Sequence, residues 1–319
     1  MSNIFTKRVN YKPFEYPEVL NFVDLINKSF WVHSEIDFTA DLQDFKTNLN
    51  DHEREVVKRS LLGIAQVEVG VKTFWGDLYK YLPKPEFNGL GATFAECEFR
   101  HSEAYSRLLE VLGYNDEFLN LLDIPVFKNK LELIERHLNS EEDFIGKLLF
   151  FTIVIENTSL FSQFANILSF TRFKGHMKNV SNIIGWTSVD ESIHAEAGIF
   201  ILNQIKKESP ESVKGLLENL GTKLDEYISY ESNLLDWIYE EGELDFFTKE
   251  DMMNFMKYRL DDSLVKLGQP KYFNVTDEEY SKMKWYEEEM YSTALDDFFC
   301  RRPVDYTKHD KPMTENDLF

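Results

Sequence analysis

The 319-residue chain contains only two cysteines, Cys97 and Cys300, which is too few for a framework of disulfide bonds. Residues 1–16 lack the apolar core of a signal peptide, so we expect a reducing, cytoplasmic environment. Long runs of lysine and arginine are absent, and 56 acidic residues outnumber 35 basic ones, which gives a formal net charge of −21. Because this charge repels phosphate backbones and anionic lipids, we expect neither nucleic acid nor a membrane as a partner.

Proline and strand-like alternation are also scarce over most of the chain. Between the nine prolines lie long blocks in which apolar residues recur at three- and four-residue spacing, the period of an α-helix. Asn50 is expected to cap the first block and Gly113 to end the second. The pattern predicts an all-α bundle of long helices packed side by side. The predicted helical blocks are residues 50–81, 88–113, 127–138, 141–172, 174–207, 210–240 and 249–267.

No change of composition marks an internal boundary before about residue 300, so we expect one helical domain over residues 1–300. The tail at residues 301–319 is rich in charge and poor in apolar residues until it ends in Leu318 and Phe319. This composition predicts a flexible C-terminal segment that docks on another protein.

Two apolar segments each carry a single carboxylate in their interior. Glu68 is the only charge in residues 60–71, and Glu156 is the only charge in residues 148–171. The second segment has the length of a membrane span, but its carboxylate and amides favour a buried core helix. Because ionised carboxylates are costly to bury unless they are paired or bound to a metal, each requires a partner.

Two further segments contain Glu-x-x-His, at Glu98–His101 and Glu191–His194. Residues three apart share one helix face, so each pair is able to bind one ion. One such motif is weak evidence, but two motifs plus two isolated glutamates form the pattern of ferritin-like dinuclear carboxylate proteins. Oxygen and imidazole ligands of this kind suit iron or manganese. The remaining histidines, which lack such a setting and are expected to be structural or exposed, are His33, His52, His137, His176 and His309.

The motifs together resemble the small, radical-generating beta subunit of class I ribonucleotide reductase. They are FW at residues 30–31, EFRHSEAY at 98–105, Glu156 in its apolar helix and DESIH at 190–194. The resemblance covers nearly the whole chain and implies a helical homodimer whose dinuclear metal centre is oxidised by an oxygen species. It further implies that the oxidising equivalent passes to a separate alpha subunit, which reduces ribonucleoside diphosphates with electrons from a thioredoxin-type reductant.

The resemblance also implies roles for individual residues. Tyr105 matches the radical tyrosine, and Trp31 and Asp190 match the relay that leads outward from a ligand histidine. Tyr306 matches the mobile relay tyrosine of the tail, and the terminal TENDLF resembles the segment that anchors this subunit to the alpha subunit. The implied metal ligands are Glu68, Glu98, His101, Glu156, Glu191 and His194.

The chain departs from the family pattern around Glu68. Many members have aspartate there, and the spacing from Glu68 to Glu98 is one residue shorter than expected, which leaves the local helix register open. Lys72, one turn later, is expected either to point toward Tyr105 and the metals or to lie in solvent. These features favour a resemblance to class Id, in which two manganese ions store the oxidising equivalent and Tyr105 is a bystander. We therefore favour two manganese ions over two iron ions or a mixed pair.

The cysteine count agrees with the role of radical supplier. Ribonucleotide reduction requires a thiyl radical and a reducible cysteine pair at the substrate, and two cysteines in all cannot provide them. We therefore expect the substrate to bind to the partner subunit.

Three other interpretations remain open at this point. The same ligands would serve a dimetal oxidase or monooxygenase with an open substrate cavity, or a ferritin-like metal store with many metals per chain. In a purely structural helical protein, Glu68 would pair with Lys72, His101 would be a satisfied core histidine and Glu191 would be solvated.

Overall fold

The computed structural model describes residues 3–138 and 144–290. These residues form helices and no strand, and their one β-type pairing is the isolated bridge between Leu244 and Phe247. The predicted all-α class is confirmed. In the first half the α-helices are α1 (Val19–Lys28), α2 (Thr39–Gln43), α3 (Asp51–Val67), α4 (Val71–Gly76), α5 (Leu78–Tyr81), α6 (Pro85–Leu112), α7 (Asn115–Leu119) and α8 (Pro125–Leu138).

The second half contains the longest helix, α11. Its α-helices are α9 (Phe144–Phe150), α10 (Phe161–Ser169), α11 (Lys178–Glu208), α12 (Pro210–Glu218), α13 (Leu220–Ile238), α14 (Lys249–Lys266) and α15 (Asp277–Tyr280). Three segments are π-helical: η2 (Asp44–Asn48), η4 (Phe151–Ser159) and η5 (Phe170–Lys174). The short 3₁₀ turns are η1 (His33–Glu35), η3 (Leu121–Asp123) and η6 (Ser281–Met283).

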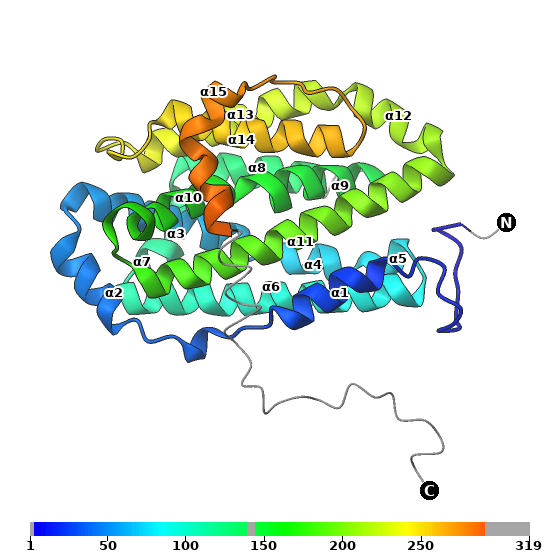
Figure 1. Cartoon of the computed structure of the whole chain (residues 1–319), viewed down its shortest axis with the longest axis horizontal. Helices are drawn as coiled ribbons and strands as arrows, with labels where there is room; N and C mark the ends of the chain where they lie inside the picture. Colours follow the sequence, from blue (N-terminus) through cyan, green and yellow to red (C-terminus); the bar gives the residue numbers. More distant parts are fainter. Residues whose placement is uncertain (1–2, 139–143, 291–319) are drawn as a thin grey trace, which may run out of the picture.

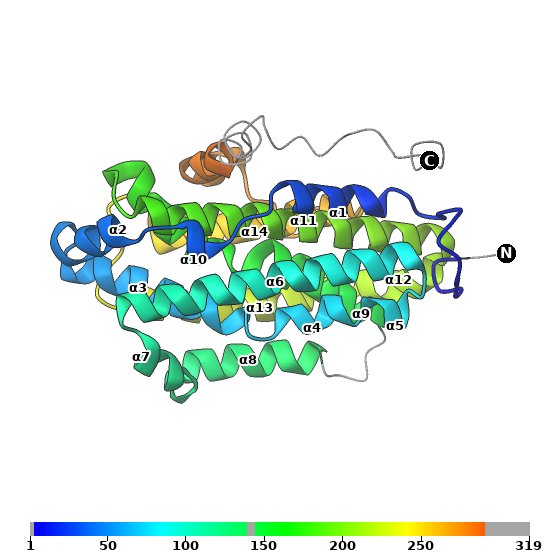
Figure 2. The ribbon, with the colours of Figure 1, turned by 90° about the horizontal axis from the view of Figure 1, so that it is seen from below.

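The long helices run side by side along the long axis of the molecule (Figures 1 and 2). Helix α6 packs against α1, α3, α4 and α11, while η4 packs against α11 and α10 against α3. The four elements that carry the predicted metal ligands are therefore neighbours in one bundle, and α8 lies at its edge, outside α4 (Figure 2).

The two helix-end signals in the sequence are confirmed. Asn50 caps α3 through a reciprocal pair of hydrogen bonds with Glu53, so that buried backbone donors at the helix start are satisfied. Helix α6 begins at Pro85 and ends at Gly113, whose φ of 82° lies in the left-handed region that glycine adopts without strain.

Three of the predicted helices are interrupted. The block at 50–81 divides because residues 68–70 form a tight turn, in which Val69 and Gly70 donate to the carbonyls of Gln66 and Val67. The block at 141–172 contains the π-helical segment η4, and the block at 210–240 divides into α12 and α13 at Asn219. Apolar periodicity does not reveal such breaks, because the buried faces continue across them.

Two glycines allow the helices around the predicted ligands to approach closely. A β-carbon at Gly91 of α6 would lie 2.5 Å from the backbone oxygen of Trp75 in α4. A β-carbon at Gly198 of α11 would overlap the side chain of Thr152 in η4. These contacts fix α4 and η4 against the two helices that carry the Glu-x-x-His motifs.

Among the described residues, one helical stretch, Phe144–Lys174, made of α9, η4, α10 and η5, is long and apolar enough to cross a membrane by length and composition. However, 89% of its most apolar window is buried inside the protein. This burial is that of a core helix, as the sequence predicts for residues 148–171.

Candidate metal centre

The six predicted ligands gather at one place in the core. Glu68 follows the last residue of α3, α6 supplies one Glu-x-x-His pair, η4 supplies Glu156, and α11 supplies the second pair. Every one of these side chains is buried, with an exposed fraction of 2% or less. The residues so assembled are Glu68, Glu98, His101, Glu156, Glu191 and His194.

The cluster has two halves that share two carboxylates. In one half, His101 Nδ1 lies 3.8 Å from Glu68, 3.4 Å from Glu98 and 3.1 Å from Glu191. In the other half, His194 Nδ1 lies 2.9 Å from Glu98, 3.2 Å from Glu191 and 3.4 Å from Glu156. Two groups of four potential ligand atoms result, and Glu98 and Glu191 belong to both.

The hydrogen bonding of these side chains fits metal ions. Both carboxylate oxygens of Glu68 and of Glu98 are buried, and none makes a well-aligned hydrogen bond within the described residues. A structural cluster would satisfy each buried carboxylate with donors. Four carboxylates with two imidazoles also carry an excess of negative charge, which two divalent cations would offset. The donor set and its unsatisfied oxygens therefore suit a dinuclear metal centre.

Without metal ions, four groups of the cluster favour their protonated forms, whereas hydrogen bonds with Glu156, His101 and His194 outweigh burial and lower the pKa of Glu191. Burial raises the pKa of Glu68 and Glu156 well above the usual range, and neighbouring carboxylates add to the increase. Burial opposes the charged forms of His101 and His194, but their acidic neighbours outweigh it and raise the pKa of both. Metal ions would take the place of these protons, because bound carboxylate and imidazole ligands are deprotonated.

A chain of contacts leads outward from the cluster through Asp190. His101 directs Nδ1 toward the carboxylates and Nε2 toward Asp190 Oδ2, at 3.2 Å. The same oxygen accepts a hydrogen bond from Trp31 Nε1 at 2.9 Å, and Ser29 donates to the other oxygen at 3.1 Å. The Trp31 ring is stacked on His101, with centroids 5.7 Å apart. The structure thus places Trp31 and Asp190, two of the residues that the family resemblance assigns to the relay, in contact with each other and with His101.

Tyr105 is buried one turn beyond His101 on α6. Burial raises the pKa of its phenol well above the usual range, and the nearby carboxylates of Glu68 and Glu191 add to the increase. Among the described residues its hydroxyl makes no well-aligned hydrogen bond, although the Thr187 side chain interacts with it and partly opposes this increase in pKa. Lys72 is half-buried, and its Nζ donates to the backbone carbonyls of Glu68 and Val69, each at 3.3 Å, at the turn that follows α3. Among the described residues it makes no hydrogen bond or ion pair with Tyr105 or a ligand carboxylate, so only the first expectation differs from the structure.

Two further side chains contact the cluster and were not predicted from the sequence. Trp75 is fully buried, and its Nε1 donates to Glu156 Oε1 at 2.7 Å. Cys97 Sγ lies 3.5 Å from His101 Nε2. For Cys97 the available signal was its place one helical turn before His101. Trp75 follows Glu68 by seven residues, but the turn at residues 68–70 separates them, so helical spacing gave no signal for it.

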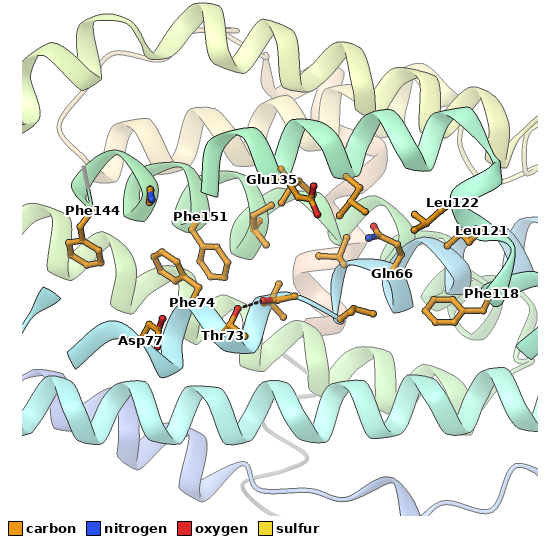
Figure 3. A pocket seen from close by; sticks show the side chains of 18 of the residues that line it. Gln66, Thr73, Phe74, Asp77, Phe118, Leu121, Leu122, Glu135, Phe144 and Phe151 are labelled. Atoms are coloured by element: carbon orange, nitrogen blue, oxygen red, sulfur yellow. Dashed lines mark hydrogen bonds between the residues drawn. The ribbon is translucent and has the colours of Figure 1, made fainter. Parts of the chain in front are cut away.

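A pocket of 790 Å³ lies beside the cluster, between α4 and α8 (Figure 3). Its lining includes Val67 and Val69, on either side of Glu68, and Ile155, which precedes Glu156. Phe74, Phe144 and Phe151 gather at one end, while Phe118, Leu121 and Leu122 gather at the other (Figure 3). The lining is largely apolar, although Gln66 has a buried carbonyl oxygen without a hydrogen-bond partner among the described residues.

The remaining predictions concern other parts of the chain. His52 Nε2 donates to the Glu243 carbonyl at 2.9 Å and His176 contacts Asp44, so both lie outside the cluster, as expected. Tyr306, Cys300 and the tail at residues 301–319 lie outside the described residues.

Comparison with known proteins identifies sequence relatives. The family model described as ribonucleotide reductase, small chain, matches residues 8–280. A relative from Plasmodium falciparum, named ribonucleoside-diphosphate reductase small chain, is 25% identical over 309 residues. The alignment covers 94% of this chain and 84% of the relative.

Solved structures show the same fold. The ribonucleotide reductase R2 subunit from Clostridium botulinum superposes with a TM-score of 0.79 at 18% identity, covering 89% of this chain and 91% of that one. The dimanganese(II) NrdF of Streptococcus sanguinis superposes with a TM-score of 0.76 at 19% identity, covering 86% and 97%. At these identities the likeness establishes the ferritin-like architecture.

Proposed function

The chain belongs to the ribonucleotide reductase small-chain family, and we propose on this basis that it generates the oxidising equivalent used by a separate catalytic alpha subunit. The alpha subunit would use it to form a cysteine radical and reduce ribonucleoside diphosphates to deoxyribonucleotides. The observation that carries this proposal is the contact series from His101 through Asp190 to Trp31, because it links the buried cluster to a side chain outside it.

Six side chains would hold the metal ions. Glu68 and His101 serve one ion, Glu156 and His194 serve the other, and Glu98 and Glu191 are shared. When bound and activated by an oxygen species, the ions supply one-electron oxidising power. We favour two manganese ions over two iron ions or a mixed pair, since the oxygen-rich ligand set accepts manganese well and a protein of the same fold is described with two.

The relay residues orient one another and hold a proton. Asp190 Oδ2 accepts from Trp31 Nε1 and faces His101 Nε2, so one carboxylate fixes both rings. When Trp31 loses an electron, its Nε1 proton becomes more acidic, and Asp190 is placed to hold that proton. Ser29 keeps the carboxylate in this orientation by donating to its second oxygen. Tyr306, outside the described residues, would continue the route toward the alpha subunit.

Partner binding follows from the same assignment. The tail would dock on the alpha subunit through its TENDLF end, and two copies of this chain would form a homodimer in the cytoplasm. The thioredoxin-type reductant would act on the alpha subunit, since this chain has no cysteine pair suited to substrate reduction.

Replacement of Trp31 tests the proposal. The Trp31→Phe subunit should bind about two metals per chain, as the wild type does, but its activity with the alpha subunit should fall at least about 100-fold because the relay is broken. Trp237→Phe is a matched control, since that indole packs on Phe127 away from the cluster. Undiminished activity of Trp31→Phe would refute the relay. Substrate oxidation without any partner would indicate a dimetal oxidase, and many metals per chain would indicate a metal store.

A further inference from the structure

The relay leaves one indole beside the metal cluster without a role. Trp75 is fully buried and donates its Nε1 proton to Glu156, a predicted ligand, at 2.7 Å. Its ring centroid also lies 6.0 Å from that of His194. The cluster is therefore in contact with two indoles, through different carboxylates, and only Trp31 belongs to the relay.

Aromatic rings connect Trp75 with the surface. Phe74 lies 5.5 Å from Trp75 between centroids and 6.5 Å from Phe144, with which it is nearly parallel. Phe144 in turn stacks on Tyr81 at 4.5 Å, with the two planes only 6° apart. Phe151 packs on Phe74 at 3.9 Å and completes the series. Tyr81, at the outer end, is 44% exposed and lines the pocket between α4 and α8.

The two ends of this series have the chemistry of redox intermediates. Tryptophan and tyrosine are the aromatic side chains that lose an electron most readily. Phenylalanine is not oxidised under these conditions, so the phenylalanines here only fill the space between Trp75 and Tyr81. The carboxylate of Glu156 favours a positive charge on the Trp75 ring. Tyr81, being exposed, is able to release its phenolic proton to water when it is oxidised.

We propose that Trp75 and Tyr81 form a second electron route, through which a small uncharged one-electron donor at the pocket reduces the oxidised metal centre. The proposal rests on the proposed function, because that function supplies the oxidised centre. It assigns to this subunit a way to discharge its oxidising equivalent when no alpha subunit is bound.

The steps balance in electrons and protons. Trp75 would give one electron to the oxidised centre and become a cation radical that keeps its Nε1 proton in the hydrogen bond to Glu156. Tyr81 then gives one electron to Trp75 and releases its phenolic proton to water, which leaves a phenoxyl radical. A hydroquinone-type donor transfers one hydrogen atom to Tyr81, restoring the phenol and leaving a semiquinone in solution.

Charge and lining select the class of donor. Phe74, Phe144 and Phe151 line this end of the pocket beside Asp77, so an aromatic donor without negative charge fits it (Figure 3). The formal charge of −21 repels anionic donors such as ascorbate. Hydroquinone is therefore the probe, and ascorbate is its anionic comparison.

The test follows the decay of the oxidised centre in the metal-loaded, activated full-length subunit without the alpha subunit. With hydroquinone added, the electron paramagnetic resonance signal should decay at least about tenfold more slowly in Tyr81→Phe and in Trp75→Phe than in wild type. The double variant should decay no more slowly than either single variant, because both residues lie on the same route. Tyr79→Phe on the same short helix and Trp237→Phe should decay as wild type does. Equal decay rates in Tyr81→Phe and wild type would contradict the proposed route. A decay with ascorbate as fast as that with hydroquinone would contradict the proposed class of donor.

A second measurement does not depend on decay rates. A nitroso spin trap added during activation should form an adduct on Tyr81, located by peptide mass spectrometry, and this adduct should disappear in Trp75→Phe. An adduct that persists in Trp75→Phe would show direct oxidation from solution and overturn the proposal. Failure to form any oxidised centre in wild type would instead count against the proposed function, so the two failures are distinguishable.

Discussion

The carboxylates of Glu98 and Glu191 each contact both histidines of the cluster. Glu98 lies 3.4 Å from His101 Nδ1 and 2.9 Å from His194 Nδ1, and Glu191 lies 3.1 Å and 3.2 Å from the same atoms. The two halves of the centre are therefore not independent, whereas Glu68 belongs to only one half.

This sharing predicts different metal contents for two alanine variants. Glu98→Ala should bind almost no metal, because both halves lose a ligand, while Glu68→Ala should keep about one of two ions in the half formed with Glu156. Elemental analysis after loading and desalting measures the content. Glu103→Ala, an exposed position on the same helix, is the control. Equal losses in Glu98→Ala and Glu68→Ala would contradict the shared arrangement.

Replacement of Tyr105 tests where the oxidising equivalent is stored. The phenol is buried and interacts with the Thr187 hydroxyl, which is a weak base, so its radical would lack a ready acceptor for the proton. We expect Tyr105→Phe to keep activity with the alpha subunit within about twofold of wild type, since storage is then on the metals. The assay is deoxyribonucleotide formation by the reconstituted enzyme. Complete loss of activity with normal metal content would place the radical on Tyr105.

Gly91 provides a test of the packing that positions Trp75. Gly91→Ala should destabilise the protein by about 1–3 kcal/mol, because its β-carbon would meet the Trp75 carbonyl oxygen and force α4 outward. Gly89→Ala, on the same helix with open space around the new methyl group, should stabilise it by about 0.5–1 kcal/mol. Denaturant unfolding of the two metal-free variants measures both. Similar free energies of unfolding for Gly91→Ala and Gly89→Ala would show that α4 can move away from α6 at little cost.

The N-terminal segment should respond to acid through Glu208. Burial opposes the charge of this carboxylate, but hydrogen bonds from Gln204, Ile4 and Tyr16 outweigh it and lower its pKa. The charged form is favoured by folding, so its contribution is complete above the ordinary pKa of 4.5 and is lost as the pH falls through the lowered value. The protection of the Ile4 amide against hydrogen exchange, relative to its intrinsic rate at each pH, should fall in that range.

Glu208→Gln should exchange quickly at Ile4 at every pH, because the amide cannot replace the carboxylate as acceptor of all three bonds. Glu211→Gln, exposed at the start of α12, is the control and should keep the wild-type profile. If the protection of the Ile4 amide in the wild type does not change with acid, the hydrogen bond to Glu208 does not hold the N-terminal segment in place.

The sequence predicts the ligand cluster well because its signals are local. A carboxylate alone in an apolar helix and a Glu-x-x-His pair on one helix face can be recognised in a single sequence. All six of these side chains lie in one cluster in the structure. The same holds for the Asn50 cap and the Gly113 end, which depend on residues within one turn.

The rest depends on contacts between distant segments. Trp75 reaches Glu156, 81 residues away, only because α4 lies close to α6 at Gly91. The hydrogen bonds of Lys72 to the turn arise because the helix stops at residue 68, and periodicity cannot show this stop. The π-helical turns of η4 likewise follow from packing on α11 rather than from composition.

The turn at residues 68–70 divides the first ligand-bearing helix into two rigid pieces. One residue added or removed in a continuous helix rotates everything beyond it by about 100°, so such a change in α6 would carry His101 off the face of Glu98. At the turn, the same change would alter the loop and leave both α3 and α4 in register with their neighbours. Insertions and deletions should therefore accumulate at this one ligand during evolution, while the two Glu-x-x-His helices keep a fixed length.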